Sequence, residues 1–369
     1  MKLIDIVAGA RPNFMKIAPI IEALEVDAAD ELEYRLIHTG QHYDKAMSGA
    51  FFDQLGIPEP AVNFGVGGGS QAEQAGGIMI AYETLLNERL SDLCLVVGDV
   101  TSTMACTITA KKMGVRVAHV EAGIRSGDLS MPEEINRMAT DALTDLFFTT
   151  SETANSELRR CGHAEDRIFF VGNTMIDTLL KHREHFHPPA CWDALGLCEG
   201  RYLVLTLHRP ANVDEEKNLI DMLKAIVEGG RGLPVVFPVH PRTAKALEHA
   251  GIKLENLYFV SPLPYLEFNF LVSRALGVVT DSGGVTEETT VMGIPCMTLR
   301  DSTERPETVV VGTNELVGAD PSKIGPYLER LFAGKWKRGG IPEKWDGRAG
   351  RRIAEVLARE FPEVGRRTC

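Results

Sequence analysis

The chain has 369 residues, of which 44% are hydrophobic and 24% charged, and its formal net charge at pH 7 is −12. One hydrophobic core rarely grows to this length, so we expect two domains. The negative charge argues against general nucleic-acid binding, which needs a basic surface. No apolar stretch approaches the roughly 18 residues that span a bilayer, and the first residues do not read as a signal peptide, so we expect a cytoplasmic protein without a membrane segment.

The cysteines and histidines do not predict a metal site. The seven cysteines form no CxxC pair, and several lie in apolar runs where a free thiol packs as a small hydrophobe. His182, His185 and His187 are close in sequence, but they stand beside two prolines, where an exposed linker is the better interpretation than a ligand set. We therefore expect no disulfide, no metal and no cofactor.

In the first half, apolar runs of strand length alternate with helical stretches, which is typical of a parallel sheet flanked by helices. The expected strands are residues 3–8, 34–38, 93–97, 115–120 and 145–149, with helices at 104–113 and 175–185. The polar, proline-containing residues 185–189 predict a linker, so we place an N-terminal domain at residues 1–180.

The second half repeats the pattern, with expected strands at residues 202–207, 235–239, 257–260, 277–280 and 295–299. We place the C-terminal domain at residues 190–350. Residues 351–369 contain a last helix that is a candidate to pack back on the first domain. The resulting fold class is α/β, with two Rossmann-like domains and a cleft between them.

Five carboxylates stand between residues 96 and 137: Asp99, Glu121, Asp128, Glu133 and Glu134. Asp99 and Glu121 each directly follow a predicted strand, and the carboxyl edge of a parallel sheet is where ligands bind. The alternative is that Asp99 only caps the next helix and Glu121 is a solvated loop charge. Because both stand at the same kind of strand end, we favour a site for proton chemistry.

The first strand ends at Gly9 and is followed by Arg11 and a helix that contains Lys16. A glycine turn at a helix N-terminus with two cations predicts a phosphate site. A tight turn with a solvated Arg11 is an equal alternative.

Residues 280–288, TDSGGVTEE, follow a strand in the second half. The N–H groups of Ser282, Gly283 and Gly284 at a helix start predict a diphosphate cradle, and Glu287 or Glu288 would accept hydrogen bonds from ribose hydroxyls. An ordinary helix start with solvated glutamates is the alternative.

Two histidines, His208 and His240, each follow a predicted strand of this half. A single histidine in such a place is usually structural, but two at strand carboxyl ends favour a role in the cleft. His208 would serve there as acid, base or charge partner for the carboxylates.

Ten runs carry a resemblance to a known family: GARPNFMKIAP (9–19), HTGQHYD (38–44), GDVTST (98–103), HVEAGIRSGD (119–128), MPEEINR (131–137), GNTMID (172–177), LHRPANVD (207–214), PVHPR (238–242), TDSGGVTEE (280–288) and RDSTERPE (300–307). Together they resemble the non-hydrolysing UDP-N-acetylglucosamine 2-epimerases, in the right order and over nearly the whole chain. The resemblance implies a GT-B fold, a homodimer, a UDP-sugar substrate and no cofactor. The implied reaction interconverts UDP-N-acetylglucosamine and UDP-N-acetylmannosamine by anti elimination of UDP to 2-acetamidoglucal and syn re-addition.

The resemblance also implies roles for residues at matching motif positions. The catalytic set comprises Asp99, Glu121, Glu133 and His208. The substrate-binding set comprises Arg11, Lys16, Arg137, His240, Ser282, Gly283, Gly284, Glu288 and Arg305. Gln41 and His42 match positions through which some members are activated by their substrate.

Two departures from the family motifs leave the sugar open. Asn13 stands where many members have glutamate, and residues 208–212 read HRPAN where many read HR-x-EN. Loss of these acidic residues would alter sugar contacts and leaves room for a related UDP-2,3-diacetamido-uronic acid. A GT-B glycosyltransferase and a non-catalytic sugar-nucleotide sensor are further alternatives, against which the acidic set argues.

Overall fold

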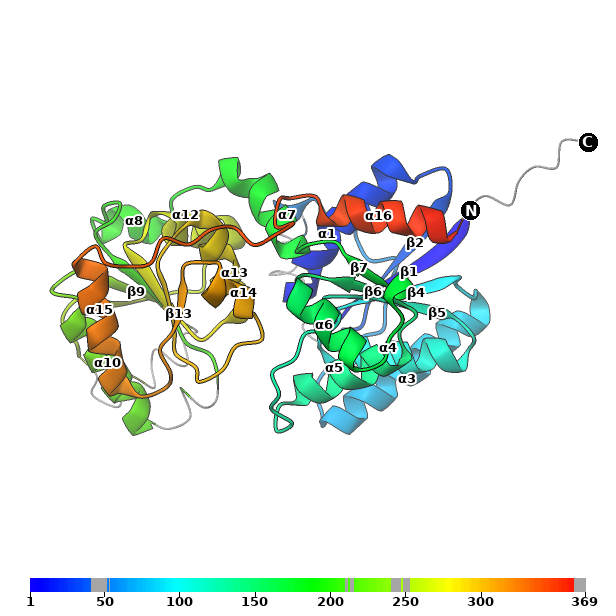
Figure 1. Ribbon diagram of the computed structural model, residues 1–369, viewed down its shortest axis with the longest axis horizontal. Coiled ribbons are helices and arrows are strands. Elements are labelled where there is room, and N and C mark those ends of the chain that lie inside the picture. Colours follow the sequence, from blue (N-terminus) through cyan, green and yellow to red (C-terminus); the bar gives the residue numbers. More distant parts are fainter. Residues whose placement is uncertain are drawn as a thin grey trace, which may run out of the picture. The chain divides into compact units, whose positions relative to one another are not determined.

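The computed structural model describes residues 1–40, 52, 54–209, 212, 216–239, 247 and 253–361, and for Arg11 and Glu216 it describes the backbone alone. The chain forms two compact units (Figure 1). The first comprises Met1–Lys181 and Glu343–Cys369, and the second His182–Pro342. Within the described residues, no helix is both long and apolar enough to span a membrane.

The first unit contains a parallel sheet with the strand order β3-β2-β1-β4-β5-β6-β7. Its strands are β1 (Lys2–Ala8), β2 (Leu32–His38), β3 (Val62–Asn63), β4 (Leu93–Val97), β5 (Arg116–Val120), β6 (Leu146–Thr149) and β7 (Ile168–Phe170). The chain order reverses between β1 and β4. In open α/β sheets, the carboxyl end of such a switch point is where ligands bind.

Helices cover both faces of this sheet. They are α1 (Arg11–Asp27), α3 (Gln71–Glu88), α4 (Thr101–Lys112), α5 (Pro132–Leu143), α6 (Glu152–Arg160), α7 (Thr174–His182) and α16 (Ala349–Glu360), with the 3-10 turn η1 (Glu165–Arg167). The C-terminal helix α16 lies alongside α1, while α3, α4 and α5 lie side by side on the other face (Figure 1).

Contacts with α7 and α1 fasten α16 to this unit. The Asp177 carboxylate accepts a hydrogen bond of 2.7 Å from the N–H of Gly350, in the first turn of α16. A Cβ atom on Gly350 would lie 2.4 Å from the carbonyl oxygen of Pro19 in α1, so only glycine permits this approach. Helix α16 thus packs on α1 and α7 of the first unit.

The second unit contains a parallel sheet with the order β10-β9-β8-β11-β12-β13. Its strands are β8 (Leu203–Thr206), β9 (Val235–Pro238), β10 (Leu257–Val260), β11 (Gly277–Thr280), β12 (Cys296–Thr298) and β13 (Asn314–Leu316). Its helices are α8 (Ala190–Ala194), α10 (Glu216–Gly229), α12 (Tyr265–Arg274), α13 (Gly283–Met292), α14 (Pro306–Val310) and α15 (Ile324–Phe332), with η2 (Arg183–His185) and η3 (Pro321–Lys323). Its switch point lies between β8 and β11.

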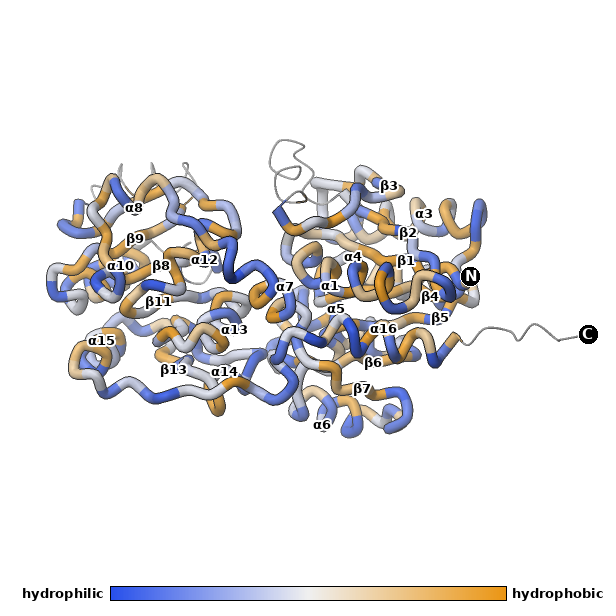
Figure 2. Tube along the Cα trace, turned by 90° about the horizontal axis from the view of Figure 1, so that it is seen from above, coloured by the Kyte–Doolittle hydropathy of each residue, from blue (hydrophilic) through white to orange (hydrophobic). Residues whose placement is uncertain are grey.

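Hydrophobic residues concentrate in the central strands of each unit, and hydrophilic residues in the outer loops (Figure 2). All five residues of β4 are buried, as expected for a strand covered on both faces. The charge of Asp5 within β1 is accommodated by a bidentate ion pair with Arg35 and by a 2.9 Å hydrogen bond from the Tyr82 hydroxyl. This buried triad satisfies the carboxylate in the middle of the sheet.

The sequence located most strands, and β4, β10 and β11 have the predicted ends. It did not predict β3, β7 or β13. These strands have only two or three residues, too few for a periodic pattern, and β13 holds one apolar residue, Leu316. In β13, Asn314 is buried, and a 2.7 Å hydrogen bond from Thr298 of β12 to its side-chain oxygen offsets the cost of burying the amide.

Candidate active site

The loop after β4 is held rigidly at the switch point of the first sheet. Gly98 has a φ of +69°, a conformation that favours glycine, and its N–H donates to the carbonyl of Val120 at 3.0 Å. His119 Nε2 lies 2.8 Å from the Gly98 carbonyl oxygen, and Asn136 Nδ2 donates to the Asp99 carbonyl oxygen at 2.8 Å. The backbone that carries Asp99 is therefore fixed on three sides.

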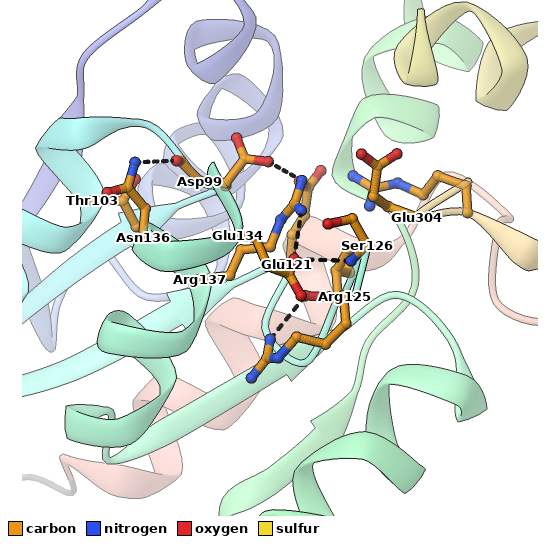
Figure 3. A network of polar contacts seen from close by, with 12 residues as sticks. Asp99, Thr103, Glu121, Arg125, Ser126, Glu134, Asn136, Arg137 and Glu304 are labelled. Carbon is orange, nitrogen blue, oxygen red and sulfur yellow. Dashed lines mark hydrogen bonds and ion pairs between the residues drawn. The ribbon is translucent and has the colours of Figure 1, made fainter. Parts of the chain in front are cut away.

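The Asp99 carboxylate forms an ion pair with Arg137 of α5 (Figure 3). Asp99 does not cap the next helix, because the N-cap of α4 is Val100, so the capping alternative is wrong for this residue. The Asp99 side chain stays 28% exposed while Arg137 is buried. The Asp99 carboxylate is thus partly exposed to solvent, and the buried guanidinium of Arg137 holds it by an ion pair.

Glu134 supports Arg137 in turn, a role that the sequence did not assign. Its buried carboxylate accepts a 3.0 Å bond from Arg137 and bonds from the N–H groups of Ser126 and Gly127 (Figure 3). Burial raises the pKa of Glu134, but these hydrogen bonds outweigh burial and lower it. Because Glu133 and Glu134 are adjacent, the sequence alone did not indicate which of the two would be buried.

Glu121 directly follows β5 and is buried rather than solvated, so the solvated-loop alternative is also wrong. Its φ is +68°, an uncommon value for a residue with a side chain and one that is enriched at functional sites. Lys16 of α1 pairs with the Glu121 carboxylate at 2.7 Å. Lys16, predicted to bind phosphate, is therefore placed beside a candidate catalytic carboxylate.

Glu133 and Arg11 complete the predicted residues of this unit. Glu133 lies half-buried in the first turn of α5, and no ion pair to it occurs among the described residues. Arg11 is the first residue of α1, and its side chain lies outside the described part. Their roles stay predictions, while Asp99, Glu121, Lys16 and Arg137 do meet at one edge of the sheet.

In the second unit, His208 follows β8 and Asp281 follows β11. His208 Nδ1 lies 2.7 Å from the fully buried Asp281 carboxylate, while 61% of the histidine side-chain surface is exposed. Asp281 also accepts hydrogen bonds from the N–H groups of His208 and Arg209 and from Asn212 Nδ2. The carboxylate thus orients the imidazole and leaves its other edge accessible.

The protonation of Asp281 follows from these contacts. Burial raises its pKa, but the hydrogen bonds and the charge of His208 outweigh burial and lower the pKa to about 2. Asp281 is therefore ionised at neutral pH. The sequence contained this residue in the TDSGG run, but nothing in the run indicated a histidine 73 residues earlier as its partner.

The predicted cradle lies at the start of α13, with Ser282 as its N-cap. The first N–H groups of a helix have no partner within the helix, and the macrodipole there favours anions. A Cβ atom on Gly283 would have no neighbour within 4 Å, so the helix start is open at this residue. This arrangement suits an anion at Ser282, Gly283 and Gly284.

Glu288 lies further along α13 and is buried beside Tyr265 and Asn269 of α12. Burial raises the pKa of Glu288 to about 7, although the nearby polar groups of Tyr265 and Asn269 act in the opposite direction. The other glutamate of the run, Glu287, pairs with Arg305 at the start of α14. The structure thus separates two neighbours that the sequence left equivalent as ribose acceptors.

One of the two departures from the family motifs, Asn13, has a structural explanation. Asn13 Oδ1 accepts from the N–H groups of Gly9 and Ala10, and its Nδ2 donates to Val97. The other departure, Ala211, lies outside the described residues, while Asn212, which matches the motif, is buried and bonded to Asp281. Because both polar atoms of the Asn13 amide are hydrogen-bonded within its own unit, this departure carries little information about the sugar.

Three predicted residues lie outside the described part of the chain: Gln41, His42 and His240. Within the described ranges, no group of three or more histidine, cysteine or carboxylate side chains is arranged to hold a metal ion.

Two Rossmann-like parallel units, each with polar side chains gathered at its switch point, define an α/β enzyme of the GT-B fold class, as predicted. The family model described as UDP-N-acetylglucosamine 2-epimerase matches residues 24–358. The chain therefore belongs to the UDP-N-acetylglucosamine 2-epimerase family, which are isomerases, and the predicted family and enzyme class are confirmed.

Individual relatives cover nearly the full length. A UDP-N-acetylglucosamine 2-epimerase of Methanocaldococcus jannaschii is 38% identical over 97% of this chain and 99% of its own. A crystal structure of the M. jannaschii enzyme with UDP-GlcNAc and UDP superimposes with a TM-score of 0.85 over 97% of this chain and 100% of that one, at 38% identity. A UDP-2,3-diacetamido-2,3-dideoxy-D-glucuronate 2-epimerase of Pseudomonas aeruginosa is 37% identical over 97% of this chain and 100% of its own.

Proposed function

We propose that this protein catalyses the reversible epimerisation of UDP-N-acetylglucosamine to UDP-N-acetylmannosamine at C2. The observation that carries the proposal is the pairing at the first switch point, where Asp99 and Glu121 each stand next to a cation, Arg137 and Lys16. The C2 proton of the sugar is weakly acidic, so its removal needs a positioned, ionised base. Neighbouring cations favour the ionised form of a carboxylate.

The proposed chemistry is an elimination followed by an addition. A carboxylate of the set Asp99, Glu121 and Glu133 removes the C2 proton, and the C2–H electron pair forms a C1=C2 double bond. The C1–O bond to UDP breaks, and anti elimination yields 2-acetamidoglucal and UDP. A proton then returns to the opposite face of C2, and the UDP oxygen adds back to C1 in the syn sense. Epimerisation needs no net oxidation.

The second unit is proposed to hold UDP throughout. The N–H groups of Ser282, Gly283 and Gly284 would bind the diphosphate and stabilise the charge that develops as UDP departs. His208, held by Asp281, would supply a further donor. The nucleotide role proposed for Glu288 is to accept hydrogen bonds from the ribose.

Arg11, His240 and Arg305 complete the proposed substrate-binding set. The support for Arg11 and His240 is their motif position. Arg305 is buried and forms an ion pair with Glu287. This ion pair fixes the orientation of the guanidinium and also connects α13 to the start of α14.

A second candidate substrate is a UDP-2,3-diacetamido-uronic acid. The observation that favours it is the P. aeruginosa relative, whose 37% identity is close to the 38% of the M. jannaschii relative. Identity alone therefore does not separate the two sugars. Parallel assays with each UDP-sugar distinguish the two candidates, because the favoured substrate is the one with the larger kcat/KM.

Carboxamide variants test the proposed chemistry. We expect Asp99→Asn, Glu121→Gln and Glu133→Gln each to lower turnover by orders of magnitude, about 10²-fold or more, because each removes a base while keeping its shape. UDP affinity, measured by calorimetry, should stay nearly unchanged. Normal turnover in all three variants would refute the assignment, and release of UDP that depends on an added acceptor would support a glycosyltransferase instead.

We also propose a homodimer. Ile135 and Met138 of α5 and Ile80 of α3 are about half exposed or more, which leaves an apolar surface on the α3–α5 face of the first unit. Light scattering after size exclusion tests this, and a monomeric mass would contradict it. Activation by substrate through Gln41 and His42 stays a prediction from motif position.

A further inference from the structure

His119 is completely buried in β5, directly before the end of that strand. Its Nε2 lies 2.8 Å from the carbonyl oxygen of Gly98, and its Nδ1 lies 2.7 Å from Oδ1 of Asp141 in α5. A carbonyl oxygen and an ionised carboxylate can only accept hydrogen bonds. Both ring nitrogens must therefore donate, so the buried ring carries two protons.

Asp141 is the centre of this arrangement. Its Oδ2 accepts a 3.1 Å bond from the N–H of Gly123 and pairs with Arg125 at 2.7 Å. Burial raises the pKa of Asp141, but the charges and hydrogen bonds of His119 and Arg125 outweigh burial and lower it. One ionised carboxylate thus joins strand β5, the loop after it and helix α5.

The two backbone groups that His119 and Asp141 bind, the Gly98 carbonyl and the Gly123 N–H, lie close to the two candidate catalytic carboxylates in the sequence. The Gly98 carbonyl belongs to the peptide that leads into Asp99, and because the peptide is planar, fixing its C=O also fixes the Asp99 N–H. Gly123 lies two residues after Glu121, whose positive φ needs support from its surroundings. On the N-terminal side of Glu121, the backbone is held by the hydrogen bond from the Gly98 N–H to the Val120 carbonyl oxygen.

We propose that His119 and Asp141 are positioning residues that set the backbone of Asp99 and Glu121 for proton transfer. The inference rests on the proposed epimerase function. Neither side chain reaches the substrate, because both are fully buried, and they act through the Gly98 and Gly123 peptides. A displacement of about 1 Å in a reacting group can cost about 10²-fold in rate, so a buried pair of this kind affects turnover without contacting the sugar.

The test compares His119→Gln and Asp141→Asn with a matched control, Tyr82→Phe. Tyr82 is as buried as His119, belongs to the same unit and donates to the buried Asp5, which lies in the middle of β1 away from the loops. We expect both positioning variants to lower kcat about 10²-fold, with KM and UDP affinity changed by about twofold at most. The control should lower the melting temperature without lowering kcat.

A double-mutant cycle separates positioning from general destabilisation. In an Asp99→Asn or a Glu121→Gln background, His119→Gln should lower kcat by a smaller factor than in the wild type, because one of the two carboxylates through which it acts is already lost. Additive losses, or a His119→Gln enzyme that loses stability but keeps its kcat, would overturn the proposal.

Nitrogen-15 NMR of histidine in the wild-type protein provides evidence even if a variant does not fold. We expect His119 to show two ring N–H groups, and a neutral ring would overturn the proposal. If the wild type converts neither UDP-sugar, the proposed function fails and this inference fails with it, whereas an active wild type with normal variants refutes the inference alone.

Discussion

Replacing Asp281 with asparagine tests the electrostatics of the second unit. The carboxylate is fully buried and accepts hydrogen bonds from His208, Arg209 and Asn212. In Asp281→Asn, the new NH2 group would face these donors. In the native protein, the pKa of the Asp281 carboxyl group is lowered from an ordinary 3.8 to about 2, and each pKa unit corresponds to 1.36 kcal/mol. The native contacts therefore stabilise the ionised form by about 2 kcal/mol.

The sign of the pH dependence follows from the lowered pKa. The stabilisation is fully present above about pH 4, where the unfolded chain is also ionised, and it is lost as the pH falls towards 2. We expect Asp281→Asn to lower the free energy of unfolding by about 2 kcal/mol at pH 7, with a difference that shrinks below pH 4. Turnover should fall about 10²-fold because His208 loses its orientation.

The assay is urea unfolding followed by tryptophan fluorescence, since Trp192 and Trp336 both lie in the second unit. Asp193→Asn is the control, because Asp193 is exposed in the same unit and its replacement should change stability by less than about 0.5 kcal/mol. A difference between wild type and Asp281→Asn that stays constant from pH 7 to pH 2 would refute the reasoning.

Three further predictions address other sites. Gly283→Ala should leave the melting temperature unchanged, because a Cβ there has no neighbour within 4 Å, but should weaken UDP binding about tenfold by obstructing the cradle; calorimetry showing unchanged affinity would contradict a diphosphate at this helix start. Because the pKa of Glu288 is raised to about 7, UDP-N-acetylglucosamine should bind about tenfold more weakly at pH 6 than at pH 8, and Glu288→Gln should remove this dependence; a pH profile that Glu288→Gln leaves unaltered would exclude Glu288 as its source. Burial raises the pKa of Asp177 from 3.8 to about 6. The protonated form therefore stabilises the fold below about pH 4, and this contribution of about 3 kcal/mol to the free energy of unfolding is lost as the pH rises through 6. Asp177→Asn should remove this pH dependence of the free energy of unfolding. Equal slopes in urea titrations of the two proteins would count against that pKa.

The sequence located several strand ends that carry the candidate residues, because local signals were strong there. Apolar runs that stop at glycine turns located the strand ends that carry Asp99, Glu121 and His208, and in parallel sheets such ends share one edge. The alternation of strands and helices predicted a parallel sheet flanked by helices in each half, and the strand order came from the structure.

The partners of these residues were not predictable in the same way. Lys16 meets Glu121 across 105 positions of the chain, and Asp281 meets His208 across 73. No periodicity or turn signal encodes such a pairing, which depends on how the helices pack on the sheet. The doubly donating ring of His119 was hidden for the same reason, because within β5 it reads as one more residue of a buried strand.

The most direct test of the central claim is proton NMR of the purified protein with UDP-N-acetylglucosamine in D2O. The account predicts that UDP-N-acetylmannosamine appears and that deuterium enters at C2 in the product and, with time, in the substrate. A UDP-N-acetylglucosamine spectrum that stays unchanged and fully protonated at C2 would contradict epimerisation of this sugar by C2–H cleavage.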